Sequence, residues 1–212
     1  MANSNIVLIG ASGHAKVVID LIERLDQSQI AFIIDDNPAL KGSSLFGYPI
    51  IGGRSESAAQ NAGKDGMHVI VAIGNNEIRQ AMSLWAKSLG YALLSAVHPS
   101  AQIGRGTVVA AGSVVMAGAV INADTTIGEN VIVNTSASID HDCRIGDNVH
   151  ISPGCHVCGG VTVGEGSFIG AGSTIIPNIK IGRNVIVGAG STVLDHVPDG
   201  VTVVGSPARK IA

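Results

Sequence analysis

Residues 127–151 read IGENVIVNTSASIDHDCRIGDNVHI, and every sixth residue of this stretch is Val or Ile. The same step of six runs from Val97 to Val193 without an insertion, so that seventeen positions in a row carry a β-branched aliphatic side chain. An α-helix has a period of about 3.6 residues and a strand a period of about 2, so neither produces this pattern. A short fixed repeat of β-branched residues is typical of a parallel β-helix, which we predict for residues 97–198.

A second repeat position follows each Val or Ile by four residues. It carries small or apolar side chains, among them Thr107, Ser113, Ala119, Cys143, Cys155, Ser173 and Val197. Three hexads form one triangular coil, so residues three hexads apart stack at the spacing of neighbouring strands, about 4.8 Å. The seventeen hexads make a little under six coils, and without insertions we expect no loop to protrude from the prism.

The composition excludes several classes of protein. Aromatic residues make up only 3% of the chain, and Phe168 is the only one after Val97, as a narrow coil without room for rings requires. A net charge of −3 argues against nucleic-acid binding, which normally needs a basic face. No apolar run approaches the roughly 20 residues that span a bilayer, and the N-terminus lacks the pattern of a signal peptide. We therefore expect neither nucleic-acid binding nor membrane insertion.

The cysteines indicate the compartment. There are three, an odd number that fits a reducing environment, and we expect a cytoplasmic protein. Cys143 and Cys155 occupy the small inward position of their hexads, where a buried thiol acts as a small apolar group. Cys158 lies beside an apolar repeat position, and we interpret all three as structural.

The first 96 residues follow a different pattern. Short apolar strands are expected at 6–9, 31–34, 69–73 and 91–97, and helices at 17–25 and 77–89. Strands that alternate with helices predict a small parallel α/β sheet, which is Rossmann-like but about half the usual size. Residues 40–53, rich in Gly and Ser, are expected to form a surface excursion.

The domain boundary is expected at His98-Pro99, because the residue before a proline is forced into extended geometry. The predicted organisation is a Rossmann-like domain at 1–96, a β-helix at 97–198 and a capping tail at 199–212. A prism with flat exposed faces and open ends is usually stabilised by side-by-side trimerisation and by end caps, so we expect a homotrimer.

Glycines and polar residues gather at three expected strand ends. GASGH (10–14) follows the first strand and opens a helix, where free N–H groups can bind a phosphate. Asp35 and Asp36 end the second strand, where an acid commonly binds ribose hydroxyls, and GNN (74–76) ends the third. The spacing is not GxGxxG, so the dinucleotide fingerprint is absent. These strand ends predict a nucleotide or nucleotide-sugar site; ordinary tight turns are the alternative.

Asp140-His141-Asp142 forms a second candidate site. The third position of a hexad faces outward, and a histidine between two carboxylates is suited to act as a general base near neutral pH. One coil above His141 lies Gly159, followed by Gly160; this pair leaves a slot over the ring and offers a backbone N–H to an oxyanion. A solvated surface histidine without a role is the alternative.

Two further polar residues, Asn134 and His150, can approach His141 only from a neighbouring subunit. Asn134 lies in the preceding hexad and His150 half a coil away, so neither shares a face with His141 within one chain. In a trimer, His150 of one subunit can approach His141 of the next. A zinc site made of His141, His150 and His156, as in gamma-class carbonic anhydrases, is an alternative, but no HxxxxH pair supplies two ligands at one height. We expect no metal.

With the repeat, GASGH and the DHD segment in place, the chain resembles the hexapeptide-repeat sugar acetyltransferases. It is most similar to the branch that joins a nucleotide-sugar domain to a left-handed β-helix. This branch includes the N-acetyltransferases of UDP-4-amino-4,6-dideoxy sugars (bacillosamine synthesis) and the sialic acid O-acetyltransferases. The motifs that carry the resemblance are IGASGH (9–14), IDDN (34–37), AIGNNEIR (72–79), NTSASIDHDCRIG (134–146) and GSPARKI (205–211).

The resemblance implies roles for individual residues. His141 would be the general base and Asp142 the acid that orients it, with Asn134 nearby; many members read His-Glu, so the Asp here is a shorter arm. The residues implied to bind acetyl-CoA are His150, beside the thioester, together with Gly159, Ala171, Ala189, Arg209 and Lys210. The residues implied to bind the UDP-sugar are Gly10, Ser12, Gly13, His14, Asp35, Asp36, Gly74 and Asn75.

The expected reaction is direct transfer of an acetyl group from acetyl-CoA to the amino group of a UDP-4-amino-4,6-dideoxy sugar, in active sites between the subunits of a homotrimer. A covalent acetyl-enzyme is not expected, because no Ser or Cys stands beside His141 as a nucleophile. An O-acetyltransferase of the sialic acid type is the nearest alternative, and a trimeric zinc lyase the more remote one.

Overall fold

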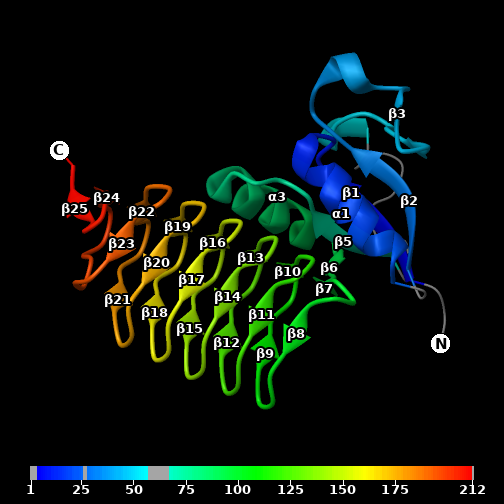
Figure 1. The fold of residues 1–212 in the computed structure, drawn as a ribbon. Coiled ribbons are helices and arrows are strands. Elements are labelled where there is room, and N and C mark those ends of the chain that lie inside the picture. Colours follow the sequence, from blue (N-terminus) through cyan, green and yellow to red (C-terminus); the bar gives the residue numbers. More distant parts are fainter. Residues whose placement is uncertain (1–3, 26–27, 57–66, 212) are drawn as a thin grey trace. The chain divides into compact units, whose positions relative to one another are not determined.

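The computed structural model describes residues 4–25, 28–56 and 67–211. The chain divides into two compact units, residues 1–96 and 97–212. Figure 1 shows an α/β fold in the first unit, in blue to green, and stacked short strands in the second, in green to red.

The first unit is built on a four-stranded sheet with the order β2-β1-β5-β6. Its strands are β1 (Ser4–Ile9), β2 (Ser28–Ile34), β5 (Met67–Val71) and β6 (Ala92–Leu93), all in parallel pairs. The two helices are α1 (Gly13–Glu23) and α3 (Asn76–Ser88). The two central strands are β1 and β5, and their buried residues are all apolar. This is typical of a parallel sheet, which is covered on both faces. This arrangement confirms the predicted small α/β fold.

The excursion at 40–53 forms a small hairpin. A short 3-10 helix, η1 (Pro38–Leu40), precedes β3 (Ser44–Leu45) and β4 (Tyr48–Pro49), which pair in antiparallel fashion. The turn between them contains Phe46 and Gly47, both with a positive φ.

The predicted strand at 91–97 is wrong as a single element. Ala92–Leu93 pairs with β5 in the α/β sheet, whereas β7 (Ala96–Val97) is the first strand of a sheet in the second unit. The apolar run therefore serves two sheets, which hydrophobicity alone does not reveal.

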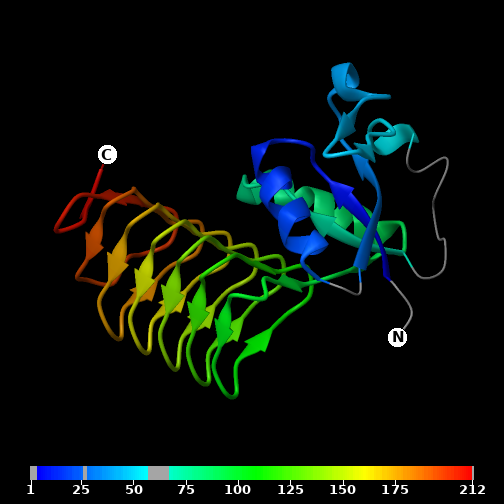
Figure 2. The ribbon, with the colours of Figure 1, turned by 45° about the vertical axis from the view of Figure 1, so that its right-hand side comes forward.

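The second unit is a left-handed parallel β-helix. Each coil contributes one two-residue strand to each of three sheets, and residues 18 apart pair in parallel, as in Ser138↔His156 and Ile139↔Val157. Figure 2 shows the successive coils stacked one after another at an oblique angle. The remaining strands are β8 (Gln102–Ile103), β9 (Val108–Val109), β10 (Val114–Val115), β11 (Val120–Ile121), β12 (Thr126–Ile127), β13 (Ile132–Val133), β14 (Ser138–Ile139), β15 (Arg144–Ile145), β16 (His150–Ile151), β17 (His156–Val157), β18 (Thr162–Val163), β19 (Phe168–Ile169), β20 (Thr174–Ile175), β21 (Lys180–Ile181), β22 (Ile186–Val187) and β23 (Thr192–Val193).

The repeat residues form the core of the β-helix. From Ile121 to Val193 every Val or Ile of the hexad series is at most 2% exposed, and the small inward residues Ala119, Cys143 and Cys155 are fully buried. Each coil turns at corners that need a positive φ, a conformation that Gly, Asn and Asp tolerate best. The residues other than Gly that adopt it in this unit are Asp124, Asn130, Ser136, Asp142, Asn148, Asn178 and Asn184.

The C-terminal segment extends one face of the prism. β24 (Thr202–Val204) pairs in parallel with β22, and β25 (Arg209–Lys210) pairs with β24 in antiparallel fashion. Val203 and Ala208 pack against the β-helix core. No helix in the described part of the chain has the length and apolar character of a membrane span.

Candidate functional site

His141 lies in the turn between β14 and β15. Its Nδ1 is 2.8 Å from Oδ2 of Asp142, and both side chains are largely exposed, at 62% and 68%. Asp142 has a φ of 59°, a left-handed conformation that places its carboxylate beside the preceding ring. Because Nδ1–H is donated to the carboxylate, the lone pair of the neutral ring is on Nε2. The shorter Asp arm therefore still holds the ring.

A second carboxylate acts on the same histidine. Asp140 Oδ1 accepts hydrogen bonds from the backbone N–H of His141 and from Nδ2 of Asn122, each at 2.9 Å, and these donors lower the pKa of Asp140. The hydrogen bond to Asp142 and then the charge of Asp140 raise the pKa of His141 above its ordinary value. The two carboxylates stabilise the imidazolium that forms when His141 takes up a proton.

Gly159 lets the His141 ring lie against the next coil of the β-helix. A Cβ at position 159 would lie 2.7 Å from both Nε2 and Cε1 of His141, so any side chain there would collide with the basic nitrogen. The coils are locked at this height because Gly160 N–H donates to the His141 carbonyl at 2.9 Å. Within the described residues the N–H of Gly159 donates to no acceptor. This corner thus holds a base next to a glycine whose N–H is not used within the described residues.

Asn134 belongs to a different corner of the prism. It follows β13 of the eight-stranded sheet, whereas His141 follows β14 of the six-stranded sheet. Its Nδ2 is 3.1 Å from Nε2 of His150, and the His150 ring makes an edge contact with Phe168 at 5.2 Å between centroids. The structure therefore joins Asn134 to His150 and separates both from His141 within one chain.

The remaining residues implied to bind acetyl-CoA also lie apart from His141. Ala171 and Ala189 follow β19 and β22, at the same corner as Asn134. Arg209 and Lys210 form β25, where Arg209 Nη1 is 3.8 Å from Asp195 and Lys210 is exposed. Only Gly159 shares the corner of His141. Within one chain, the other residues therefore lie at different corners of the β-helix from His141.

The histidines do not form a metal site in the part of the chain that is described. His156 lies in β17, and its Nδ1 is 2.8 Å from the Ser138 hydroxyl, on a different face from His150. No cluster of three His, Cys, Asp or Glu side chains suited to a metal is found among the described residues.

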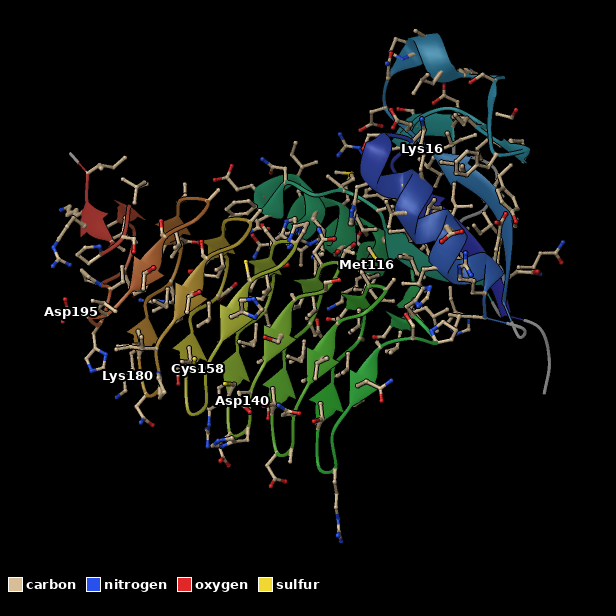
Figure 3. All side chains as sticks on the ribbon, viewed as in Figure 1. Lys16, Met116, Asp140, Cys158, Lys180 and Asp195 are labelled. Carbon is tan, nitrogen blue, oxygen red and sulfur yellow. The ribbon has the colours of Figure 1, made fainter. Side chains whose placement is uncertain are left out.

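The cysteines also lie where the repeat predicts. Cys143 and Cys155 point inward and are buried, and Cys143 Sγ donates to the Cys158 carbonyl at 3.2 Å. Cys158 follows β17, one coil from Asp140, and both are labelled in Figure 3. Burial raises the pKa of the Cys143 thiol, which makes it a poor nucleophile.

The first unit contains a cavity of about 490 Å³ at the carboxyl edge of its sheet. Apart from Arg54, which follows the excursion at 40–53, the residues that line it come from the ends of β1, β2 and β5 and from one face of α3: Ile9, Gly10, Ile34, Asp35, Asp36, Ile73, Glu77, Ile78, Ala81 and Met82. Ligands of open parallel sheets bind outside this edge. A cavity of this size lies in the range of small-molecule binding sites, roughly 300–1,000 Å³.

Asp35 and Asp36 connect the segments that line this cavity through hydrogen bonds. Asp35 accepts hydrogen bonds from the backbone N–H groups of Ala11, at 2.8 Å, and Asn37, at 2.9 Å, and so ties the loop after β1 to the end of β2. Asp36 accepts from the backbone N–H and Nε of Arg54, at 2.9 and 2.8 Å. Both predicted acids lie at the cavity, and each is already bound to protein donors.

Two helix N-termini meet this edge of the sheet, and they differ in their caps. Asn75 Oδ1 accepts from Ile78 N–H at 2.9 Å and caps α3, whereas Ser12 makes no side-chain cap on α1. An N-terminus without a side-chain cap is the one that can bind an external anion. Burial, and then the charge of Arg79, lower the pKa of His14 to about 4, so this ring is neutral at neutral pH.

The structure adds residues to which the sequence analysis assigned no role, three of them within the motif AIGNNEIR (72–79). Arg54, Glu77 and Ile78 line the cavity, and Arg79 lies behind it. The helical spacing of Glu77 and Ala81, and of Ile78 and Met82, is the signal that places these side chains on one face of α3. Arg54 carries no such signal, because it follows an irregular excursion.

Comparison with known families matches both units. Residues 5–85 match the PglD N-terminal domain, and residues 124–159, 142–176 and 160–195 match the bacterial transferase hexapeptide (six repeats).

Solved structures are similar over the whole chain. PerB from Caulobacter crescentus, in complex with CoA and GDP-perosamine, is 39% identical, with a TM-score of 0.92 over 100% of this chain and 99% of that one. The acetyltransferase domain of PglB from Neisseria gonorrhoeae FA1090, in complex with acetyl coenzyme A, is 37% identical, with a TM-score of 0.90 over 99% and 100% of the two chains. WeeI from Acinetobacter baumannii AYE is 29% identical, with a TM-score of 0.88 over 97% and 99%. The chain is an acyltransferase that belongs to the PglD family of hexapeptide-repeat sugar N-acetyltransferases.

Proposed function

We propose that this enzyme transfers the acetyl group of acetyl-CoA to the amino group of a nucleotide-linked 4-amino-4,6-dideoxy sugar, with UDP as the nucleotide. The contact between His141 and Gly159 is the observation that carries the proposal, because it sets a base that Asp142 orients beside a residue whose N–H is not used within the described chain. The complexes of the relatives with acetyl coenzyme A and with GDP-perosamine support the two substrate classes.

In the proposed reaction, Nε2 of neutral His141 accepts a proton from the sugar amine as its nitrogen attacks the thioester carbonyl. The C–N bond forms, the carbonyl oxygen becomes an oxyanion, and the N–H of Gly159 donates to it. The intermediate then collapses, the C–S bond breaks, and the CoA thiolate leaves and takes up the proton from His141. Asp142 orients the ring throughout, through the 2.8 Å hydrogen bond to Nδ1.

The substrates bind to different surfaces in this proposal. The cavity of the first unit takes the nucleotide, and the N-terminus of α1 at Gly13 and His14 takes the pyrophosphate. Asn134 and His150 of a neighbouring subunit, with Ala171 and Ala189 at the same corner, line the pantetheine arm in a homotrimer, and Arg209 and Lys210 meet the CoA phosphates. The separation of Asn134 and His150 from His141 within one chain supports the need for a second copy.

Turnover of acetyl-CoA tests the proposal. Release of CoA is measured with a panel that contains UDP- and GDP-linked 4-amino-4,6-dideoxy sugars, their 4-hydroxy analogues and a sialic acid. We expect turnover with an amino sugar and a higher kcat/KM for the UDP-linked form. Acetylation of sialic acid instead contradicts the N-acetyltransferase, and a preference for the GDP-linked sugar contradicts the nucleotide assignment alone.

A further inference from the structure

Arg79 is a buried charged residue of the first unit that the proposed chemistry does not use. It lies in the first turn of α3, is 1% exposed, and does not line the cavity. A cation at a helix N-terminus opposes the helix dipole, and a buried charge is costly to desolvate. Its position therefore does not stabilise the helix by itself, and its hydrogen bonds indicate another role.

The guanidinium of Arg79 folds back over the loop between β5 and α3. Nη1 donates to the carbonyls of Ile73, at 3.2 Å, and Gly74, at 3.1 Å, and Nη2 donates to Oδ1 of Asn76 at 2.9 Å. One planar group thus holds three successive parts of the loop, a geometry that the fork of an arginine provides and a lysine does not.

This loop is in direct contact with the loop after β1. Gly10 has a φ of 104°, and a Cβ there would lie 2.8 Å from the Ile73 side chain and 3.0 Å from the Ala72 carbonyl. The N–H of Gly10 donates to the Ile34 carbonyl at 2.8 Å, at the end of β2. A displacement of Ile73 and Gly74 would therefore be passed to all three strand ends that surround the cavity.

The charges that line the cavity also support a role for Arg79. Three carboxylates line it, those of Asp35, Asp36 and Glu77, against the one guanidinium of Arg54, which is paired with Asp36. Because His14 is neutral, the lining by itself repels a pyrophosphate. Arg79 supplies a positive charge behind the loop, next to the N-terminus of α1.

We propose that Arg79 is a positioning residue for the nucleotide sugar: it holds the Ile73–Asn76 loop in shape and offsets the negative lining of the cavity. This inference rests on the proposed function of the cavity. It concerns binding of the nucleotide sugar and leaves the base, His141, and the acetyl-CoA surface unchanged.

The test compares R79M, which removes both charge and fork, with R79K, which retains the charge alone. We expect KM for the nucleotide amino sugar to rise about 30-fold in R79M and about fivefold in R79K, while KM for acetyl-CoA stays within about twofold of wild type. R24M is the matched control, because Arg24 is an exposed arginine of the same unit that pairs with Asp20 at 3.1 Å. The thermal midpoint of each variant is measured alongside.

The outcomes separate the possibilities. An unchanged KM for the nucleotide sugar in R79M, with a lower thermal midpoint, shows a purely structural role and overturns the inference. If R79M does not fold, a wild-type KM in R79K overturns it equally. A wild-type enzyme that neither binds nor acetylates any member of the panel contradicts the proposed function itself, whereas an active wild type with an unaffected R79M contradicts only this inference.

Discussion

The His141 ring lies directly against the α-carbon of Gly159, so that a methyl group at that position would be 2.7 Å from Nε2. Position 159 is not in the left-handed region of φ, and an alanine there tests the space over the ring and not the backbone conformation. The two residues are 18 apart in the sequence and one coil apart in the β-helix. This contact leads to the first prediction.

Replacing Gly159 by Ala is expected to lower kcat about 100-fold, because the added methyl group would lie 2.7 Å from Nε2 and force the His141 ring out of its position beside Asp142. Turnover of acetyl-CoA with the preferred amino sugar measures the effect. The thermal midpoint and the affinity for acetyl-CoA, measured by calorimetry, serve as controls. Activity close to wild type would mean that catalysis does not depend on the position of the His141 ring against Gly159.

Replacing His141 by Ala removes the proposed base and is expected to lower kcat by about 10²–10⁴-fold. Binding of acetyl-CoA should stay near normal, since the ring is exposed and supports no other element. Single-turnover kinetics check the prediction. If activity falls by less than tenfold, about 1.4 kcal/mol, the assignment of the base is wrong.

The pH dependence of kcat/KM tests the role of Asp140. His141 must be neutral to accept a proton, so activity falls as the pH drops below its pKa, which Asp142 and Asp140 both raise. Replacing Asp140 by Asn removes a negative charge, lowers the pKa of His141 and should move the acid limb to lower pH. V108A, at an exposed position of the same β-helix, is the control. An acid limb at the wild-type pH would exclude this electrostatic effect.

Acid should destabilise the first unit through His14. Its pKa is about 4 in the folded chain and 6.5 as the ordinary value, so the unfolded state binds the proton first. The contribution of neutral His14 to the free energy of unfolding, about 3 kcal/mol in total, is therefore fully present above about pH 6.5. It is lost as the pH falls toward 4. Urea unfolding is followed by the fluorescence of Trp85, the single tryptophan, which packs against the core of this unit.

H14Q provides the comparison for this measurement, because glutamine is polar but does not titrate in this range. The stability of H14Q should vary less between pH 7 and pH 4 than that of wild type. An equal loss in both proteins would assign the acid sensitivity to other groups.

Mixing inactive variants tests whether the site is shared between subunits. H141A and H150A should each be inactive alone, and trimers formed from an equal mixture should recover about a quarter of wild-type activity, since a shared site is intact when each neighbour supplies its wild-type residue. CoA release after dissociation and reassembly measures the recovery. No recovery, with mixed trimers demonstrated by mass, would place both histidines in sites within one chain.

Much of the second unit is predictable from the sequence because its structure is periodic. A step of six sets the inward residues, and a step of 18 sets the vertical neighbours, so the register of Gly159 over His141 follows from counting. The same regularity predicts the buried positions of Cys143 and Cys155. Periodicity does not extend to side-chain pairs across the sheet, and the pairing of Asn134 with His150 was not predicted.

The first unit was predictable only in outline. The strand ends at Gly10, Asp35 and Gly74 were expected to form one site, but the motifs did not identify Arg54, which reaches Asp36 from an excursion without a repeat. The division of residues 91–97 between two sheets was also missed, because an apolar run does not specify which strand it pairs with.

The sequence by itself determined the β-helix, the inward and outward positions along it, and the contact between positions 141 and 159, because each follows from local spacing. Only the tertiary structure decided which carboxylates are occupied by protein donors and that a buried guanidinium supports the loop at the cavity. Hydrogen bonds between segments far apart in the chain depend on distance and direction in space, and no spacing along the sequence encodes them.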